Sequence, residues 1–221
     1  MASRTPSKAD KIIAGHKNGT VHAWRTDDLE MLDKMVAEHD ITVSLLPYEH
    51  HVRVASFCIR HNKNMVSTSY VSKEMKALDE EAKNAGILLL NEMGVDPGFD
   101  HMTAMRVIDK VQEQGGKIKE FYSLCGALPA PEEADNPFGY KFSWSPRGVL
   151  KASNNGATYR KNNQIINIPA DDLFKNPLQI EFPEVGKLEV YPNRDSLVYS
   201  KLYNLQDAET VFRGTFRYPH W

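Results

Sequence analysis

The sequence predicts an α/β protein with two domains, at residues 1–98 and 99–221. In the first half, short apolar runs alternate with helical patterns, which is typical of a parallel sheet with crossover helices. Turn residues follow three of these runs, as at the ligand-binding edge of a doubly wound sheet. After about residue 117, short strand-like runs separated by polar turns indicate a mixed or antiparallel sheet. We therefore expect a partial Rossmann-like sheet followed by an incomplete α+β domain.

The elements of the first half follow from their periodicity and their end signals. Asp27 is expected to cap a helix in which Leu29, Leu32, Met35 and Val36 recur at helical spacing. Ser72 is expected to cap another helix, which ends before Gly86. The remaining expected elements are strands at 41–45, 65–68 and 87–90 and a helix at 50–62. Together they alternate as strand and helix, which is half of a doubly wound sheet.

A polar turn at Asp96-Pro97-Gly98 separates the last of these strands from a helix expected at 99–114. Pro97 favours an extended Asp96, and Gly98 lets a ligand approach the backbone closely. The amide groups at the start of the helix carry a partial positive charge. The turn is therefore the first candidate ligand site, and an ordinary strand-to-helix turn with a solvated aspartate is the alternative.

The second half contains short strands. They are expected at 117–126, 164–168, 188–191 and 210–218. The run Leu128-Pro-Ala-Pro131 is interpreted as a rigid surface loop and not as a proline-rich ligand.

Composition excludes several classes of protein. A formal net charge of −2 without a basic stripe argues against nucleic-acid binding and against an anionic membrane partner. Cys58 and Cys125 are too few for a disulfide framework and too far apart for a metal knuckle. His50 and His51 are adjacent, so a shared metal is not expected. No run has the length of a membrane span or the pattern of a signal peptide. We expect a cytoplasmic protein, with the mitochondrion as the alternative.

Two phosphate-binding motifs are absent from the sequence. It contains neither Gly-x-Gly-x-x-Gly nor the loop Gly-x-x-x-x-Gly-Lys-Ser/Thr. If the first domain has a dinucleotide fold, we expect its first strand and its glycine-rich phosphate turn to lie outside this sequence.

Seven segments together resemble the family of saccharopine reductase, the glutamate-forming saccharopine dehydrogenase. In order they are Ser-Leu-Leu-Pro-Tyr (44–48), Ser-Thr-Ser-Tyr-Val (67–71), Glu-Met-Gly-Val-Asp-Pro-Gly-Phe-Asp-His (92–101), Cys-Gly-Ala-Leu-Pro-Ala-Pro (125–131), Tyr-Lys-Phe-Ser-Trp-Ser (140–145), Tyr-Pro-Asn-Arg-Asp-Ser (191–196) and Arg-Gly-Thr-Phe-Arg-Tyr (213–218). The resemblance covers nearly all of the chain after about Thr20, and we expect it to cover about half of a family member.

The resemblance implies an oxidoreductase of lysine metabolism. Such an enzyme interconverts saccharopine with 2-aminoadipate 6-semialdehyde and glutamate. Hydride passes between a nicotinamide cofactor and an imine or secondary amine. Because a protonated imine is already electrophilic, the protein mainly has to position the reactants and stabilise charge. The cofactor is NADP or NAD, and the sequence does not distinguish between them.

Three residues correspond to family positions near the reacting centre: Tyr70, Asp96 and Cys125. We expect them to shape the site more than to form an essential acid–base pair. Each has a structural alternative. Tyr70 could be a core aromatic residue, Asp96 could stabilise a helix start, and Cys125 could be a small buried hydrophobe.

The same resemblance assigns binding residues. The expected cofactor contacts are Leu46, Thr68, Ser69, Val95, Asp96, Pro97, Gly98, Ser143, Trp144 and Ser145. The expected substrate contacts are Ser69, Tyr70, Asp96, Arg194, Thr215, Phe216 and Arg217. Saccharopine carries three carboxylates, and arginine holds a carboxylate through two parallel hydrogen bonds. The alternative for Arg194 is a surface ion pair with Asp195.

Three functional hypotheses remain open at this point. The chain is part of an active saccharopine-forming or saccharopine-cleaving oxidoreductase, or it is a non-catalytic remnant that binds a dicarboxylic amino acid or another subunit. The third hypothesis is a related imine reductase of polyamine metabolism. The expected partner is a small-molecule substrate, and a homo-oligomer is a further expectation. The sequence does not show in which direction the reaction runs physiologically, or whether the parent protein is fused to a lysine-condensing domain.

Overall fold

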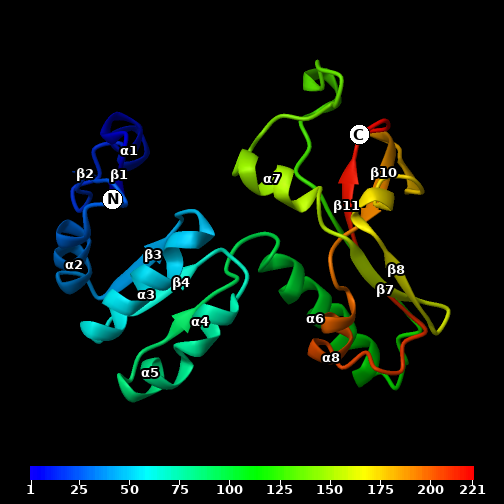
Figure 1. The fold of residues 1–221 in the computed structure, drawn as a ribbon, viewed down its shortest axis with the longest axis horizontal. Helices are drawn as coiled ribbons and strands as arrows, with labels where there is room; N and C mark the ends of the chain where they lie inside the picture. The colour runs from blue at the N-terminus through cyan, green and yellow to red at the C-terminus, as the bar shows by residue number, and fades with distance from the viewer. The chain divides into compact units, whose positions relative to one another are not determined.

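A computed structural model describes residues 1–221, which divide into two compact units. The first unit is Met1–Gly98 and the second is Phe99–Trp221 (Figure 1). None of the helices combines the length and the apolar character needed to cross a membrane.

The first unit begins with a small strand–helix–strand element for which the sequence analysis assigned no structure. Strands β1 (Ala2–Ser3) and β2 (His22–Ala23) pair in parallel. Helix α1 (Pro6–Ile13) connects them, with Pro6 in its first turn, where proline is tolerated. The helix ends at Ala14, which adopts the left-handed conformation.

A three-stranded parallel sheet forms the centre of the first unit. Its strands β3 (Ile41–Ser44), β4 (Asn64–Ser67) and β5 (Leu89–Leu90) lie in chain order. Helix α2 (Leu29–Ala37) precedes β3. The connections between the strands are the 3₁₀ turn η1 (Tyr48–His50), α3 (His51–Arg60), α4 (Lys73–Ala77) and α5 (Asp79–Asn84). The predicted alternation of strands and helices around a parallel sheet is therefore confirmed.

Two predicted details of these helices are wrong. Asp28, and not Asp27, caps α2, because its carboxylate accepts a hydrogen bond from the backbone N–H of Met31 at 3.0 Å. Asp27 instead pairs with Arg25. The helix predicted from Ser72 to Asn84 is two short helices, because the chain turns at Leu78; Ser72 caps the first of them as expected.

The core of the first unit lies on one face of this sheet. Its buried members are Trp24, Leu32, Val36, Val54, Ala55, Cys58, Met65 and Met75. Ile41 and Val43 alternate with inward residues of β3 and are 52% and 59% exposed. The helices therefore bury one face of the sheet, while apolar residues line the other.

The second unit is built on a mixed six-stranded sheet. Five strands lie in the order β8-β7-β11-β10-β9, and β6 pairs in parallel with β11. The bounds are β6 (Glu120–Cys125), β7 (Ala157–Lys161), β8 (Gln164–Ile168), β9 (Leu178–Phe182), β10 (Gly186–Pro192) and β11 (Thr210–Arg217). The predicted mixed sheet is confirmed, although β7 and β9 had no predicted counterpart.

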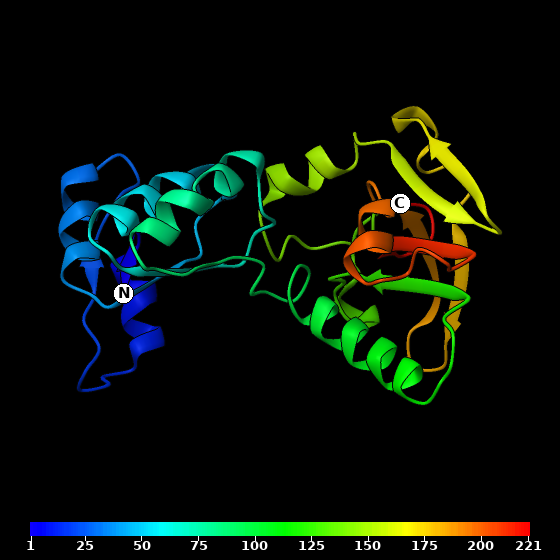
Figure 2. The same cartoon turned by 90° about the horizontal axis from the view of Figure 1, so that it is seen from below.

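Three helices and two 3₁₀ turns accompany this sheet. They are α6 (Phe99–Glu113), α7 (Pro146–Ala152), α8 (Leu197–Leu202), η2 (Pro131–Glu133) and η3 (Ala170–Asp172). Helix α6, predicted at 99–114, contributes Ile108 to a core with Tyr203, Leu205, Ala208 and Val211. Figure 2 shows α6 running beneath the strands of this unit.

Candidate functional site

The turn predicted as a ligand site lies beside the carboxyl end of β4. The backbone N–H of Met93 donates to the carbonyl of Ser67 at 2.9 Å, and that of Glu92 donates to Ser69 at 3.1 Å. These bonds hold the segment after β5 against the residues that follow β4. The strand ends therefore meet along one edge of the sheet, as parallel topology requires.

Gly98 is needed for the turn to close. Its φ is +144°, and a Cβ atom at this position would lie 2.3 Å from the carbonyl oxygen of Gly94. The N–H of Gly94 also donates to the carbonyl of Pro97 at 2.9 Å. Pro97 and Gly98 are buried, whereas Val95 is exposed. The turn therefore exposes Val95 and leaves Asp96 half-buried on a tightly packed backbone.

The structure brings two of the predicted catalytic residues together. The hydroxyl of Tyr70 donates to Oδ1 of Asp96 at 2.5 Å. Both side chains are half-buried. The neighbouring Glu92 accepts a hydrogen bond from the N–H of Val71 at 3.0 Å, which fixes the backbone beside Tyr70. A phenol bonded to a carboxylate can hold a polar ligand and exchange a proton with it.

A buried histidine that the sequence analysis considered only as a metal ligand joins two strand ends. Nδ1 of His51 lies 2.9 Å from Oγ of Ser44, and Nε2 lies 2.8 Å from Oγ of Ser69. Burial, and secondarily the charge of His50, lowers the pKa of His51. One sequence signal could have indicated these contacts: two serines follow neighbouring strands, and a histidine stands at the start of the helix between them.

The other predicted cofactor residues of the first unit have ordinary packing roles. Leu46 packs against the core of this unit. Thr68 faces Gly94, where an added Cβ would lie 3.3 Å from Cβ of Thr68. Both residues nevertheless follow the carboxyl ends of strands, the edge at which such sheets bind ligands.

In the second unit, three predicted site residues share one face of the sheet. Cys125 at the end of β6 pairs in register with Thr215 of β11. Because side chains alternate along a strand, Thr215 and Arg217 point to the same side. Phe216 points the other way and packs edge-to-face on Phe182, with ring centroids 5.6 Å apart.

Arg217 is a buried cation surrounded by aromatic rings. Its guanidinium carbon lies 4.5 Å from the ring centroid of Trp221 and 5.1 Å from that of Tyr140. The guanidinium donates to the carbonyl of Phe216 at 2.8 Å and forms no ion pair. Burial lowers the pKa of Arg217, although the group stays charged. A buried arginine without a carboxylate partner can take an anionic ligand.

A second buried arginine on the same strand has a carboxylate partner that the sequence analysis missed. The guanidinium of Arg213 lies 2.8 Å from Oδ2 of Asp100. It also stacks on Tyr199, 4.1 Å from the ring centroid. Asp100 lies in the first turn of α6, so the Arg213–Asp100 ion pair links the start of that helix to β11.

The remaining predicted residues are on the surface of the second unit. Arg194 lies in the loop after β10 with φ +51°, and its carbonyl accepts from the N–H of Thr158 at 2.8 Å. Ser143, Trp144 and Ser145 are exposed and precede α7. Ser145 caps that helix by accepting from Gly148, and Nε1 of Trp144 donates to the hydroxyl of Tyr140.

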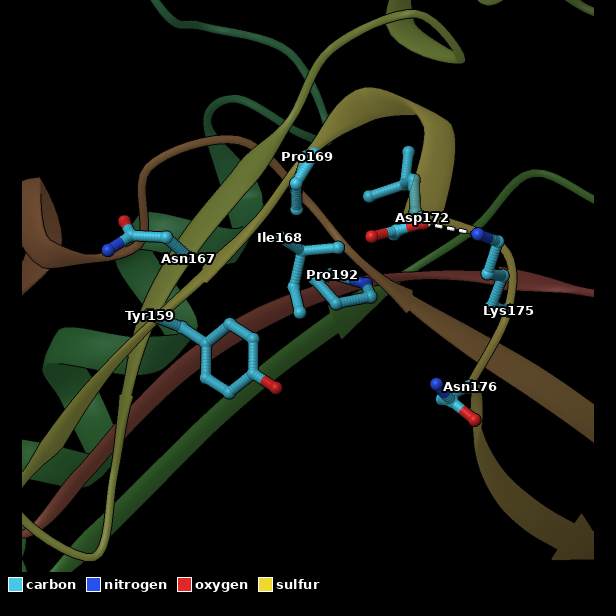
Figure 3. Close-up of a pocket in the computed structure, with 9 residues that line it drawn as sticks. Tyr159, Asn167, Ile168, Pro169, Asp172, Lys175, Asn176 and Pro192 are labelled. Atoms are coloured by element: carbon cyan, nitrogen blue, oxygen red, sulfur yellow. Dashed lines mark hydrogen bonds and ion pairs between the residues drawn. The ribbon is translucent and has the colours of Figure 1, made fainter.

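A cavity of about 330 Å³ lies elsewhere in the second unit. Figure 3 shows Lys175 bonded to Asp172 on one side of it and the ring of Tyr159 on the other. None of the predicted site residues lines this cavity. No group of three or more His, Cys, Asp or Glu side chains is placed to hold a metal ion.

Comparisons with known proteins are consistent across the chain. Residues 94–221 match the family model of the saccharopine dehydrogenase C-terminal domain, and residues 1–90 match that of the saccharopine dehydrogenase NADP binding domain. The chain is 46% identical over 218 residues to saccharopine dehydrogenase [NADP(+), L-glutamate-forming] of Schizosaccharomyces pombe, covering 99% of this chain and 48% of that protein.

Two further relatives agree with these matches. The mitochondrial alpha-aminoadipic semialdehyde synthase of Rattus norvegicus is 45% identical over 221 residues, which cover 99% of this chain and 24% of that protein. The solved structure of apo saccharopine dehydrogenase (L-Glu forming) from Saccharomyces cerevisiae matches with a TM-score of 0.87 at 42% identity. That match covers 99% of this chain and 49% of the solved chain. The chain spans about half the length of the S. pombe and S. cerevisiae relatives and 24% of the rat protein. It belongs to the saccharopine dehydrogenase family.

Proposed function

We propose that the chain supplies the nicotinamide-facing and substrate-facing residues of an NADP-dependent oxidoreductase. The reaction interconverts saccharopine with 2-aminoadipate 6-semialdehyde and glutamate, in lysine metabolism. The observation that carries the proposal is the Tyr70–Asp96 hydrogen bond, which lies at the strand ends of the unit that matches the NADP-binding model. The names of the relatives support the same reaction.

The first unit fits a dinucleotide at this edge. The turn closed by Gly98 and the hydroxyl of Ser69 both stand at the carboxyl ends of strands. A nicotinamide bound at this edge would supply the hydride chemistry that interconverts the secondary amine of saccharopine and the imine. Tyr70 and Asp96 would hold the amine in line with the ring, and the carboxylate of Asp96 would be the nearby acceptor for the amine proton.

Arg4 is the residue that we assign to the 2′-phosphate of NADP. It follows the carboxyl end of β1 and precedes α1, the place where an arginine accommodates that phosphate in dinucleotide folds. Its side chain is exposed and makes no ion pair. From the sequence, the choice between NADP and NAD stayed open because the residues that meet the ribose phosphate were expected to lie outside this chain.

Titration of the chain with NADPH and with NADH tests this assignment. Arg4→Ala should weaken NADPH binding by roughly tenfold or more and leave NADH binding unchanged, because a charged hydrogen bond to phosphate is lost. Arg25→Ala is the matched control, since Arg25 already pairs with Asp27. An equal loss for both cofactors would contradict the role of Arg4.

In the second unit, Arg217 and Arg194 are proposed to bind carboxylates of the substrate, with Thr215 and Cys125 beside Arg217. The buried, unpaired guanidinium of Arg217 supports this role most directly. Calorimetric titration with saccharopine, together with the appearance of NADPH absorbance when saccharopine and NADP are mixed, tests the whole function. Binding without turnover would instead favour a non-catalytic module that recognises a dicarboxylic amino acid.

The setting of the protein is part of the same proposal. We place it in the cytoplasm, with the mitochondrion as the alternative because the rat relative is named as mitochondrial. A homo-oligomer also stays a prediction, which sedimentation analysis of the purified protein would test.

A further inference from the structure

His51 has no ring nitrogen left for a ligand. Both nitrogens lie within hydrogen-bond distance of a serine hydroxyl, and the residue is 3% exposed. What His51 can change is therefore the way in which its two serine partners use their own hydroxyl groups.

Ser44 determines which nitrogen carries the proton. It is buried, and its hydroxyl has His51 as its one side-chain partner. If Nδ1 donated to Ser44, the hydroxyl proton of Ser44 would be buried without an acceptor, which is costly. If Ser44 donates to Nδ1, that cost is avoided. A neutral His51 then carries its proton on Nε2.

The proton on Nε2 in turn fixes the role of Ser69. Nε2–H donates to Oγ of Ser69, so the hydroxyl proton of Ser69 cannot point back at the ring. Ser69 is half-buried at the end of β4, and its Oγ has no other partner within the protein. Its hydroxyl proton is therefore available to a bound molecule.

We propose that His51 is a positioning residue that holds Ser69 as a hydrogen-bond donor toward an acceptor oxygen of the bound ligand. The acceptor is a carboxylate, phosphate or amide oxygen, and a ligand group that can only donate is disfavoured at this position. The identity of the ligand rests on the proposed function, whereas the proton arrangement rests on the contacts of Ser44 and Ser69 alone.

The proton arrangement is measured directly in the unliganded chain. Long-range proton–nitrogen correlation NMR on ¹⁵N-histidine-labelled protein near neutral pH should show Nε2 protonated and Nδ1 unprotonated for His51. Assignment uses the spectrum of His51→Gln, from which these signals vanish. Protonation on Nδ1, or on both nitrogens, would overturn the proposal. Ser44→Ala should shift the Nδ1 signal, because it removes the donor to that atom.

The effect on Ser69 is measured by ligand affinity. NADPH and saccharopine are titrated separately into the wild type, His51→Phe, Ser69→Ala and the double variant. For the ligand that contacts Ser69, we expect each single variant to lose roughly tenfold in affinity and the double variant to lose no more than Ser69→Ala. Additive losses would overturn the proposal, because they would mean that His51 acts independently of Ser69.

Two controls separate positioning from a general structural defect. His51→Gln keeps an amide donor that can reach Ser69, so it should retain affinity within about threefold, whereas His51→Phe should not. His50→Phe changes the adjacent histidine and should leave affinity unchanged. If neither ligand binds even the wild type, the proposed function fails while the NMR result still decides the proton arrangement.

Discussion

Strand β11 carries two buried arginines, four residues apart on one face, and they have opposite electrostatic situations. Arg213 is bonded to the buried carboxylate of Asp100 at 2.8 Å and stacked on Tyr199. Arg217 packs against the rings of Tyr140 and Trp221 and has no carboxylate partner. The first arginine neutralises a charge within the fold. The charge of the second is not neutralised by any carboxylate of the protein.

The comparison shows that burial alone does not identify a binding residue. The two arginines differ in whether a carboxylate of the protein pairs with the buried guanidinium. The same distinction separates His51, whose two nitrogens are both bonded, from Ser69, whose hydroxyl proton is not used within the protein.

The largest expected effect comes from breaking the internal pair. Arg213→Met leaves the carboxylate of Asp100 buried without its cation, so we expect the free energy of unfolding to fall by about 3–5 kcal/mol. Urea unfolding followed by circular dichroism measures the loss. The double change Asp100→Leu with Arg213→Met removes both charges and should recover most of it. A loss below about 1 kcal/mol for Arg213→Met would show that the pair is dispensable.

Arg217→Met should have the opposite profile. It removes an unpaired buried charge and two cation–ring contacts, so we expect the free energy of unfolding to change by about 1 kcal/mol or less. Affinity for saccharopine, measured by calorimetry, should fall by roughly tenfold to a hundredfold, because a charged hydrogen bond to a carboxylate is lost. A stability loss equal to that of Arg213→Met, with unchanged affinity, would remove the difference between the two arginines.

The sequence predicted local elements better than it predicted partners. The strand at 164–168 and the helix from Phe99 were found because a run rich in β-branched residues and a helical period are local signals. Asp28 was missed as a cap because Asp27 and Asp28 have the same chemistry, and the start of the helix decides between them. Strands β7 and β9 were missed although Leu178–Phe182 alternates between apolar and polar residues. Each is five residues long and contains one β-branched residue, whereas β8 contains three, so their strand signal is weaker.

The partners in the candidate site could not be predicted from composition or spacing. Asp100 and Arg213 are separated by 113 residues, and nothing in either local pattern indicates that they meet. His51 lies beside another histidine, and the only role considered from the sequence was a shared metal, which was not expected. Tyr70 and Asp96 were assigned to one site by family resemblance, and the hydrogen bond between them required the fold.

The pH dependence of the free energy of unfolding tests whether the fold keeps His51 neutral. Burial lowers the pKa of His51 in the folded chain below its ordinary value of 6.5. Below pH 6.5, His51 binds a proton in the unfolded chain but not in the folded chain. The free energy of unfolding should therefore fall as the pH decreases. Urea unfolding between pH 7.5 and 5.5 (about the range in which histidine titrates) measures this slope.

A matched pair of variants isolates His51 in that measurement. His51→Gln should flatten the slope, because the residue that titrates differently in the two states is gone. His50→Gln should leave most of the slope in place. If both variants have the slope of the wild type, the pH dependence has another origin and His51 is not the group held neutral by the fold.

Cys125→Ala should have the smallest effect. It tests whether the charge of Arg217 alone accounts for ligand affinity on this face of the sheet. Cys125 is half-buried beside Thr215, on the same sheet face as Arg217, and it is not in a disulfide. We expect the free energy of unfolding to fall by about 1 kcal/mol or less, since a small side chain is shortened by one atom. Saccharopine affinity should change by less than about threefold, because a neutral thiol is a weak hydrogen-bond donor and carboxylates prefer cations. If Cys125→Ala reduces affinity as much as Arg217→Met does, the thiol itself binds the ligand. The charge on Arg217 would then no longer account for recognition on this face of the sheet.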